Sequence, residues 1–417
     1  MAGVTRKRTC LVYDDLMTRH LQGSTSGCEE APKRLTAIYH HLEETGLIEQ
    51  CLLVTSRDAS REELAYVHSE RYVALMHLEP AAFETEVESR KHRTRKVHPA
   101  PGRIPSDIWA TLGTQPSILR AAGSLLNVVD TVLDDTALNG FAIIRPPGHH
   151  AHPDYPAGFC FANNVAIAAK HAVAQHGLKR VLIVDWDIHR GDGSQDAFYE
   201  DPRVCYISLH RGEFKFYPEG TEKFASSTGA GAGSGYNINI PWQQGGMTDG
   251  DYITAFLRLV MPVAYEFAPE LVLVSCGFDA ALGDPLGGCC VTEVGYGIMT
   301  RMLMTLAGGK VVLALEGGYK LEMISKCAGS VVRALLGHEP EINLVPLAPS
   351  LAGLMDIKSA LDAQRSIPNS PWKSLKSYDG NSVDYDATFS TVQTPGNLPN
   401  KESVDSLVAD LDSLSAK

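Results

Sequence analysis

The chain has 417 residues, of which 44% are hydrophobic, and its 37 Lys and Arg against 49 Asp and Glu give a formal net charge of −12 at pH 7. This length suits one large α/β domain or two smaller ones, and a mean hydropathy of −0.08 is typical of a soluble chain. The acidic balance argues against general binding to nucleic acid or membranes. The sequence has no apolar run of about 18 residues, and residues 1–8 lack the apolar core of a signal peptide, so we expect an intracellular protein. Its nine cysteines are scattered without C-x-x-C pairs, which indicates free thiols.

Short β-rich runs alternate with helical patterns along the chain. Strands are predicted near eight positions: Cys10, Leu53, Ala142, Leu182, Tyr206, Ile238, Leu271 and Val312. Helices are predicted between them over residues 32–45, 116–133, 163–175, 250–267 and 293–306. Such alternation is typical of repeated βαβ units. We therefore predict an α/β fold with a single domain, in which a central, mostly parallel sheet of about eight strands carries helices on both faces.

Three segments depart from this pattern. Residues 90–103 carry six Lys and Arg and no acid, which favours a solvated loop over a patch for acidic partners or substrate tails. Residues 228–235 are Gly-rich but lack the Lys and helix start of a phosphate loop. Beyond residue 375 the composition is too polar to order itself, so we predict a domain over 1–375 and a flexible tail over 376–417, with one short amphipathic helix at 402–414.

Polar residues directly follow four of the predicted strands. The four junctions are, in chain order, residues 141–150, 180–192, 271–279 and 311–319. The second of them begins R-V-L-I-V-D-W-D, an apolar run that ends in carboxylates, as expected of a strand buried on both faces. In parallel sheets, ligands bind beyond the carboxyl ends of the strands. The side chains at these junctions are therefore predicted to meet in one site.

Three of these side chains suit a catalytic metal. Asp187, His189 and Asp279 offer two carboxylates and one imidazole, a set that fits Zn²⁺ with its fourth position open to water and substrate. The same set would accept Fe²⁺ or Mn²⁺. The sequence therefore predicts a hydrolytic metal centre, with zinc as the first choice.

Other junction residues suit catalysis beside that metal. His149 and His150 follow the rigid turn Pro-Pro-Gly, so one ring is expected to act as a general base and the other, held cationic by a carboxylate, to stabilise an oxyanion. Tyr319 follows two glycines that permit a tight turn, and its hydroxyl would polarise a carbonyl. Phe159, and Phe216 or Tyr217, are candidates for the walls of a narrow apolar channel.

The chain resembles the zinc-dependent histone deacetylases, particularly class II, of the arginase/deacetylase superfamily. The motifs that carry the resemblance are R-P-P-G-H-H-A (145–151), G-F-C-F-A-N-N (158–164), V-D-W-D-I-H (184–189), Y-I-S-L-H (206–210), Y-N-I-N-I-P-W (236–242), G-F-D (277–279), G-D-P-L-G (283–287) and L-E-G-G-Y (315–319). The resemblance covers about residues 9–375. It implies a single parallel-sheet domain that hydrolyses acetylated lysine in proteins such as histone tails through a zinc-bound water. It also implies a nuclear or cytoplasmic protein with possible corepressor partners and no direct contact with nucleic acid.

The resemblance assigns roles position by position. Asp187, His189 and Asp279 would bind zinc, as the residue types also suggest. The other catalytic roles that the family implies are general base and acid for His150, electrostatic partner for His149, acetyl-oxygen donor for Tyr319, and orienting carboxylates for Asp185 and Asp192. Structural potassium would use Asp185, Asp187, His189, Ser208 and Leu209 at one site, and Phe198, Asp201, Val204 and Tyr236 at a second. The substrate channel would include Gly158, Phe159, Phe216, Tyr217 and Leu286.

Departures from the family pattern concern the substrate more than the chemistry. Arg190 stands where the family usually has a second His, a position that is not a metal ligand, and Asp192 is class I-like. The usual His-Pro-Glu at the cleft is replaced by C-E-E-A-P (28–32), which leaves substrate preference open. Residues 90–103 lack a family counterpart and are expected to reshape the rim of the cleft.

Three other functions remain as alternatives. An acetylpolyamine deacetylase would be favoured by an acidic residue after Gly-Asp-Pro, where this chain has Leu286. A binuclear manganese ureohydrolase would need Asp-x-His-x-Asp, but residue 191 is Gly. A catalytically silent scaffold that binds acetyl-lysine or corepressors is disfavoured by the presence of Tyr319 and both histidines.

Overall fold

The computed structural model describes residues 8–21, 29–91, 104–220, 224–339 and 348–375. Within these residues, one sheet of eight parallel strands runs in the order β2-β1-β3-β8-β7-β4-β5-β6. The strands are β1 (Arg8–Val12), β2 (Leu52–Leu53), β3 (Ala137–Ala142), β4 (Val181–Asp185), β5 (Val204–Arg211), β6 (Asn237–Trp242), β7 (Leu271–Cys276) and β8 (Val311–Leu315). Each strand lies at one of the eight predicted positions.

The central strands are apolar because helices cover both of their faces. Every residue of β4, β7 and β8 is buried, and these strands consist almost entirely of Val, Leu, Ile and Ala. Their register is continuous, with Val184 of β4 opposite Val274 of β7, and Cys276 of β7 opposite Leu315 of β8. This is the pattern expected of a parallel sheet with two covered faces.

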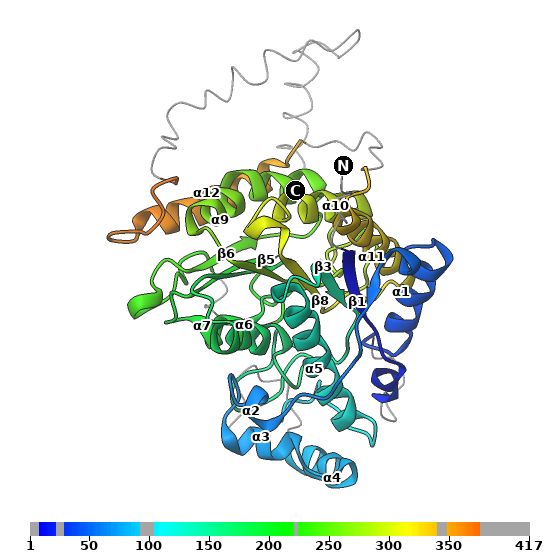
Figure 1. Cartoon of the computed structure of the whole chain (residues 1–417). Helices are drawn as coiled ribbons and strands as arrows, with labels where there is room; N and C mark the ends of the chain where they lie inside the picture. Colours follow the sequence, from blue (N-terminus) through cyan, green and yellow to red (C-terminus); the bar gives the residue numbers. More distant parts are fainter. Residues whose placement is uncertain (1–7, 22–28, 92–103, 221–223, 340–347, 376–417) are drawn as a thin grey trace, which may run out of the picture. The chain divides into compact units, whose positions relative to one another are not determined.

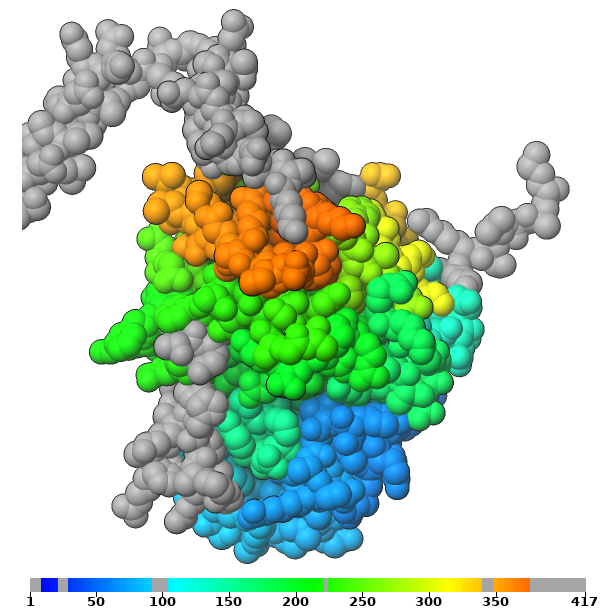
Figure 2. Space-filling view, turned by 90° about the vertical axis from the view of Figure 1, so that its left-hand side faces the viewer, coloured from blue at the N-terminus to red at the C-terminus, as the bar shows by residue number. Residues whose placement is uncertain are grey.

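Helices lie on both faces of the sheet, which confirms the predicted fold (Figure 1). One face carries α5 (Thr114–Leu133), α6 (Asn164–Gln175) and α7 (Asp192–Phe198). The other carries α1 (Lys33–Glu44), α8 (Asp249–Ala255), α9 (Met261–Phe267), α10 (Glu293–Leu303), α11 (Leu321–Leu336) and α12 (Leu351–Ser366). Three short helices, α2 (Arg61–Leu64), α3 (Glu70–Met76) and α4 (Pro80–Arg90), form a separate group. Figure 2 shows α12, in orange, on the surface above the green middle of the chain, where it packs on β6 and α8.

The predicted helix over 250–267 is interrupted. It consists of α8, a π turn over Phe256–Val260, and α9. Pro262 lies in the first turn of α9 and has no amide hydrogen, so the regular hydrogen bond to the preceding turn cannot form and the backbone widens there. The other four predicted helices are present within a few residues of their predicted ends. Helices α2, α3, α4, α7, α11 and α12 are not among the predicted ones.

Several sequence predictions lie outside the described residues. They are the basic stretch from residue 92 onward, the first residue of C-E-E-A-P, and the tail over 376–417 with its short helix. The domain boundary at residue 375 stays a prediction. Among the residues that the structure describes, no helix is both long enough and apolar enough to cross a membrane.

Four adjacent strands, β3, β8, β7 and β4, form the centre of the sheet. Strands β3 and β4 follow each other in the sequence, but β8 and β7 lie between them in the sheet. From β4 the chain continues through β5 to β6 in one direction, and from β7 to β8 it runs in the other. Loops that leave the carboxyl ends at such a point diverge and leave room between them for a ligand. These are the four junctions at which the sequence places its polar residues.

Candidate active site

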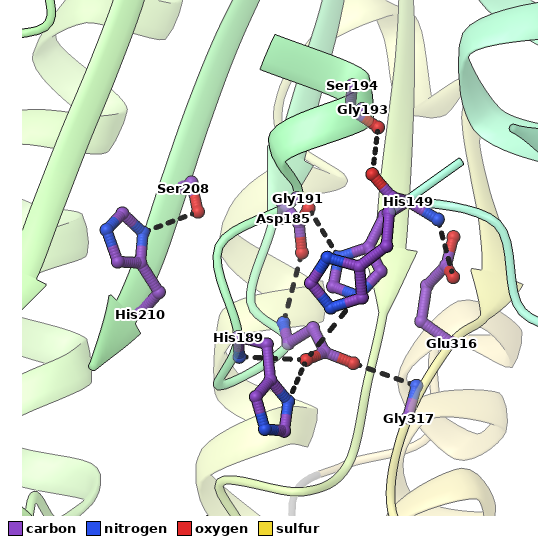
Figure 3. A network of polar contacts seen from close by, with 12 residues as sticks. His149, Asp185, His189, Gly191, Gly193, Ser194, Ser208, His210, Glu316 and Gly317 are labelled. Carbon is purple, nitrogen blue, oxygen red and sulfur yellow. Dashed lines mark hydrogen bonds and ion pairs between the residues drawn. The ribbon is translucent and has the colours of Figure 1, made fainter. Parts of the chain in front are cut away.

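The site lies where the loops after the four central strands meet. Figure 3 shows residues that the loops after β3, β4 and β8 contribute. The loop after β3 supplies His149 and His150, and the end of β4 supplies the buried carboxylates and His189. Asp279 follows β7, and the segment after β8 ends in Tyr319. The structure therefore brings together side chains that lie up to 170 positions apart in the sequence.

Asp187, His189 and Asp279 form a compact group whose ligand atoms all lie within 4.8 Å of one another. The Nδ1 atom of His189 is 3.1 Å from Oδ1 of Asp187 and 3.0 Å from Oδ2 of Asp279. Both carboxylates are fully buried. Backbone amides bind their other oxygens: Gly317 N–H donates to Asp187 at 2.8 Å, and Ile188 N–H donates to Asp279 at 2.8 Å.

This group fits a metal cation. Burial and the nearby charge of Asp187 raise the pKa of Asp279 to about 7, because two carboxylates cannot both ionise easily in a dry cluster. A divalent cation would remove that repulsion, and the two oxygens with one nitrogen are a donor set that zinc accepts. Space is reserved beside the oxygens: a Cβ on Gly277 would lie 2.1 Å from Asp187 Oδ2, and one on Gly317 would lie 2.3 Å from Asp279 Oδ2.

The His149 ring lies next to this group, between the carboxylates of Asp185 and Asp187. Its Nδ1 atom is 3.1 Å from Oδ2 of Asp185, which also accepts a hydrogen bond of 2.8 Å from the Tyr206 hydroxyl. The backbone amide of His149 donates to Glu316. Burial opposes protonation, but the charges of Asp187 and Asp185 outweigh it and raise the pKa of His149 well above its ordinary value. A cation bound by Asp187 would reduce this shift, because it would offset one of the two charges.

His150 has the opposite protonation preference. Burial and the neighbouring His149 charge lower the pKa of His150 to about 3, so its ring is neutral. Its Nδ1 atom lies 2.7 Å from Oδ1 of Asp192, the first residue of α7. With the Nδ1 proton donated to that carboxylate, the Nε2 atom carries the lone pair. Gly158, with φ of +53°, lies against this ring, since a Cβ there would be 2.4 Å from His150 Cδ2.

A third histidine, His152, continues this arrangement and was not predicted. Its Nδ1 atom lies 2.8 Å from Asp196 Oδ2, and its Nε2 atom lies 3.4 Å from Asp192 Oδ2. Burial opposes its protonation, but the neighbouring carboxylates of Asp192 and Asp196 raise the pKa of His152 to about 9. The signal in the sequence was a third His in the segment H-H-A-H, two positions beyond His150.

A pocket of about 180 Å³ leads to this cluster. All five residues predicted for the channel line it: Gly158, Phe159, Phe216, Tyr217 and Leu286. The Phe216 ring stacks on His189 at 5.0 Å, and the Phe159 ring meets Tyr319 edge-on at 6.3 Å. Pro147 of the Pro-Pro-Gly turn also lines the pocket, as do Asp107 and Lys215, which no motif in the sequence indicated.

Tyr319 lines the pocket, and hydrogen bonds to the backbone of its loop hold it in place. Its backbone amide donates to Asp284 at 2.8 Å, and Arg34 of α1 donates to the carbonyl oxygens of Gly318 and Glu316. The Arg34 guanidinium also lies 5.1 Å from the centre of the Tyr319 ring. Burial and the charge of Asp279 raise the pKa of Tyr319 well above its ordinary value, so the phenol keeps its proton and remains a donor.

Glu30 joins two buried arginines beneath this loop. Arg145 contacts both oxygens of Glu30, at 2.7 and 2.6 Å, and Arg34 lies 3.2 Å away. All three side chains are fully buried. Burial alone would raise the pKa of Glu30, but the Arg145 guanidinium lowers it to about 2. The sequence signal was a Glu and an Arg four positions apart, which is too common to single out.

The residues predicted to bind potassium fall into two places. Asp185 of β4 lies opposite Ser208 of β5, next to Leu209 and the metal group. The second set, Phe198, Asp201, Val204 and Tyr236, surrounds the turn between α7 and β5, where Phe198 and Asp201 offer backbone carbonyls. The Asp201 side chain pairs with Lys170 and Arg203, so any cation there would have to use the carbonyls. Potassium binding stays a prediction.

The sequence matches known proteins over most of its length. The model of the histone deacetylase domain matches residues 28–335. The chain belongs to the histone deacetylase family. Human polyamine deacetylase HDAC10 is 43% identical over 378 residues, which cover 90% of this chain and 54% of that protein. Histone deacetylase 5 of Arabidopsis thaliana is 39% identical over 340 residues, which cover 81% of this chain and 50% of that protein.

A solved structure of the histone deacetylase family confirms the fold. The crystal structure of the HDA15 HD domain superposes with a TM-score of 0.78 at 37% identity, and covers 93% of this chain and 99% of that one. The resemblance found in the motifs is thereby confirmed. The chain spans about half the length of these two curated relatives.

The buried ion cluster under Tyr319 generates a stability prediction. Glu30→Gln should lower the free energy of unfolding by about 3–5 kcal/mol at pH 7, because it leaves two buried guanidinium groups without their carboxylate. The folded pKa of about 2 lies below the unfolded value of about 4.3, so the contribution of Glu30 is complete above the unfolded pKa and is lost as the pH falls towards 2. Urea unfolding of both proteins should therefore show a constant difference between pH 8 and about 5.5, and a shrinking one below about 4.

Glu43→Gln is the matched control, because Glu43 lies on α1 with its side chain 62% exposed. It should change the free energy of unfolding by less than about 0.5 kcal/mol. A Glu30→Gln protein as stable as the wild type would contradict the assignment of this cluster.

Proposed function

We propose that this chain is a zinc-dependent deacetylase that hydrolyses the amide of N-acetyllysine in proteins, histone tails included. The observation that carries the proposal is the buried group of Asp187, His189 and Asp279 at the base of a narrow aromatic pocket, beside a neutral histidine and a protonated tyrosine. Membership of the histone deacetylase family supports it. We further propose a nuclear or cytoplasmic location, structural potassium, and corepressor subunits as possible partners.

Asp187, His189 and Asp279 would hold the zinc. When bound, Zn²⁺ supplies a Lewis acid that makes water acidic and polarises the amide carbonyl. The backbone amides of Gly317 and Ile188 fix the carboxylate oxygens that face away from His189, so the ligand geometry is set before any ion arrives. The pocket leaves one side of the group open to substrate.

The two adjacent histidines would divide the proton chemistry. His150 is neutral, and its Nε2 lone pair would accept the proton of the attacking water while Asp192 holds Nδ1–H. The same proton would then pass from Nε2 to the amide nitrogen as the C–N bond breaks, which releases acetate and the lysine amine. His149, paired with Asp185, would supply positive charge beside the developing oxyanion.

Tyr319 would donate a hydrogen bond to the acetyl oxygen. Its hydroxyl proton is retained because burial and the Asp279 charge disfavour the phenolate. Its ring position is set by Phe159 on one side and by the Arg34 guanidinium on the other. A donor held in place before the reaction strengthens as negative charge develops on the oxygen.

The mouth of the pocket favours a lysine side chain over a polyamine. Leu286 and the rings of Phe159 and Phe216 suit a chain of methylene groups, and the Lys215 ammonium would repel a polycation. Two observations favour the second candidate, an acetylpolyamine deacetylase. The carboxylate of Asp107 lies in the pocket lining, and the chain is similar to human polyamine deacetylase HDAC10.

The metal assignment makes a direct prediction. Asp187→Ala, His189→Ala and Asp279→Ala should each lose bound zinc and deacetylase turnover together, because three ligands leave no redundancy. Elemental analysis and a peptide assay would measure the two losses. Asp362→Ala, a change on the exposed face of α12, should keep both. Any ligand variant with stoichiometric zinc and normal turnover would show that the ligand set is wrong.

Tyr319→Phe tests the oxyanion donor. On an acetyl-lysine peptide, kcat should fall roughly 10²- to 10³-fold, equivalent to about 3–4 kcal/mol. A trifluoroacetyl amide has a more electrophilic carbonyl, so the loss on that substrate should be distinctly smaller. Tyr265→Phe, on an exposed tyrosine of α9, should leave both rates unchanged. Equal losses on the two substrates would contradict the donor role.

The substrate class is tested by comparing kcat/KM for an acetyl-lysine peptide and for an acetylated polyamine, with metal-stripped and zinc-restored protein. The peptide should be preferred. Leu286→Glu should raise kcat/KM for the polyamine roughly fivefold, because a partly exposed ion pair contributes about 1 kcal/mol. Leu282→Glu, an exposed neighbour that does not line the pocket, should not do so.

The wild-type comparison decides between the alternatives. A higher kcat/KM for the polyamine would favour the second candidate. Hydrolysis of neither substrate by zinc-loaded protein would favour the silent scaffold.

A further inference from the structure

Four ionisable side chains form a continuous line away from the proposed general base. It begins with His150 Nδ1, 2.7 Å from Asp192 Oδ1, and continues through the second oxygen of that carboxylate, 3.4 Å from His152 Nε2. The other nitrogen of His152 lies 2.8 Å from Asp196 Oδ2. His152 is buried, while the Asp196 side chain on α7 is 46% exposed. The line therefore connects the base of the pocket with the surface.

The His152 ring is held rigidly in this line. Its backbone amide donates to Tyr155 O at 3.0 Å, and its backbone oxygen lies 3.0 Å from His68 Nδ1. Its ring stacks on Tyr155 with 4.4 Å between the centres. Nδ1 is hydrogen-bonded to Asp196 and Nε2 lies 3.4 Å from Asp192, so a neutral imidazole would leave both carboxylates without a positive partner. The arrangement is that of an imidazolium between two anions.

Asp192 depends on this partner. Its Oδ1 atom accepts hydrogen bonds from His150 and from the Gly193 amide. Its Oδ2 atom is buried and has no hydrogen-bond partner among the described residues, so the His152 ring 3.4 Å away is the group that offsets its charge. An anion that is buried with one oxygen uncompensated is costly, and it would turn towards another donor. That turn would loosen its hold on the His150 ring.

We propose that His152 is a positioning residue that acts through Asp192 on His150. Its positive charge holds the Asp192 carboxylate in its orientation, and it offsets part of the negative potential that this carboxylate exerts on the general base. The proposal rests on the proposed function, since it assigns His150 the role of base. The charged and titratable groups that face His152 are Asp192 and Asp196 of α7, His68 and Tyr155, with Asp154 and Arg190 nearby.

His152→Gln tests this role, because Gln keeps a polar side chain of similar reach but carries no charge. In zinc-loaded enzyme, kcat should fall roughly 10- to 100-fold with KM and zinc content little changed, the usual range for partners of catalytic groups. The acidic limb of the kcat/KM profile should move to higher pH, since the loss of a nearby positive charge makes His150 easier to protonate. A normal kcat with an unmoved profile would overturn the proposal.

His171→Gln is the matched control for a structural effect. His171 of α6 is also buried and paired with a carboxylate, with its Nε2 atom 2.7 Å from Asp130 Oδ1, but it lies outside the pocket. It should lower the melting temperature without moving kcat or the pH profile. If both variants lose stability alike and neither changes the profile, His152 is structural only.

The His152 proposal can be tested even if the proposed deacetylase function is wrong. If the zinc-loaded wild type hydrolyses neither substrate, the proposed function fails, and the His152 proposal is then decided by ¹⁵N NMR of labelled histidines. The His150 resonance should titrate at a higher pH in His152→Gln than in the wild type. Identical titrations would overturn the positioning role without reference to turnover.

Discussion

The structure depends on keeping two carboxylates, Asp187 and Asp279, together in a place that excludes water. Their mutual repulsion at full burial is an electrostatic cost that a bound cation would remove, and the ligand set fits such a cation. Much of the surrounding architecture serves this purpose. Backbone amides of Ile188 and Gly317 bind the outward oxygens, and glycines at positions 277 and 317 leave the space that side chains would fill. The loops after β4, β7 and β8 supply these groups, because the three strands are neighbours in one parallel sheet.

The two neighbouring histidines, His149 and His150, differ in pKa because their surroundings differ. His149 and His150 are consecutive in the sequence, and their ring centres lie 4.0 Å apart. Nearby carboxylates raise the pKa of His149, and the charge of His149 in turn helps to lower the pKa of His150. A pair of titratable groups pushed in opposite directions is the usual arrangement for acid and base chemistry at neutral pH. Two consecutive residues therefore supply a charged imidazolium, His149, and a neutral imidazole with a free lone pair, His150.

The parallel sheet and most of its covering helices could be predicted because each strand carries its own local signal. The run V-L-I-V before Asp185 identifies a doubly covered strand without any knowledge of its neighbours. The positions of Asp187, His189 and Asp279 in one site followed from the rule for strand ends. Contacts made across the fold could not be predicted. Glu30 meets Arg145 over 115 positions, and Asp107 and Lys215 reach the pocket from loops whose sequences resemble ordinary surface segments. His152 was visible in the sequence, but its role depends on the place where α7 puts Asp196.

Helix α1 and the pocket are joined by Arg34, which binds the backbone just before Tyr319. If α1 detached, this backbone would lose its Arg34 hydrogen bonds and Tyr319 would lose part of its support. Docking of α1 and binding of a molecule against Tyr319 are thermodynamically linked. If docking strengthens the binding of that molecule, the bound molecule stabilises docking by the same free energy. An occupied pocket would thus slow hydrogen exchange in α1, a helix that lines no part of the pocket.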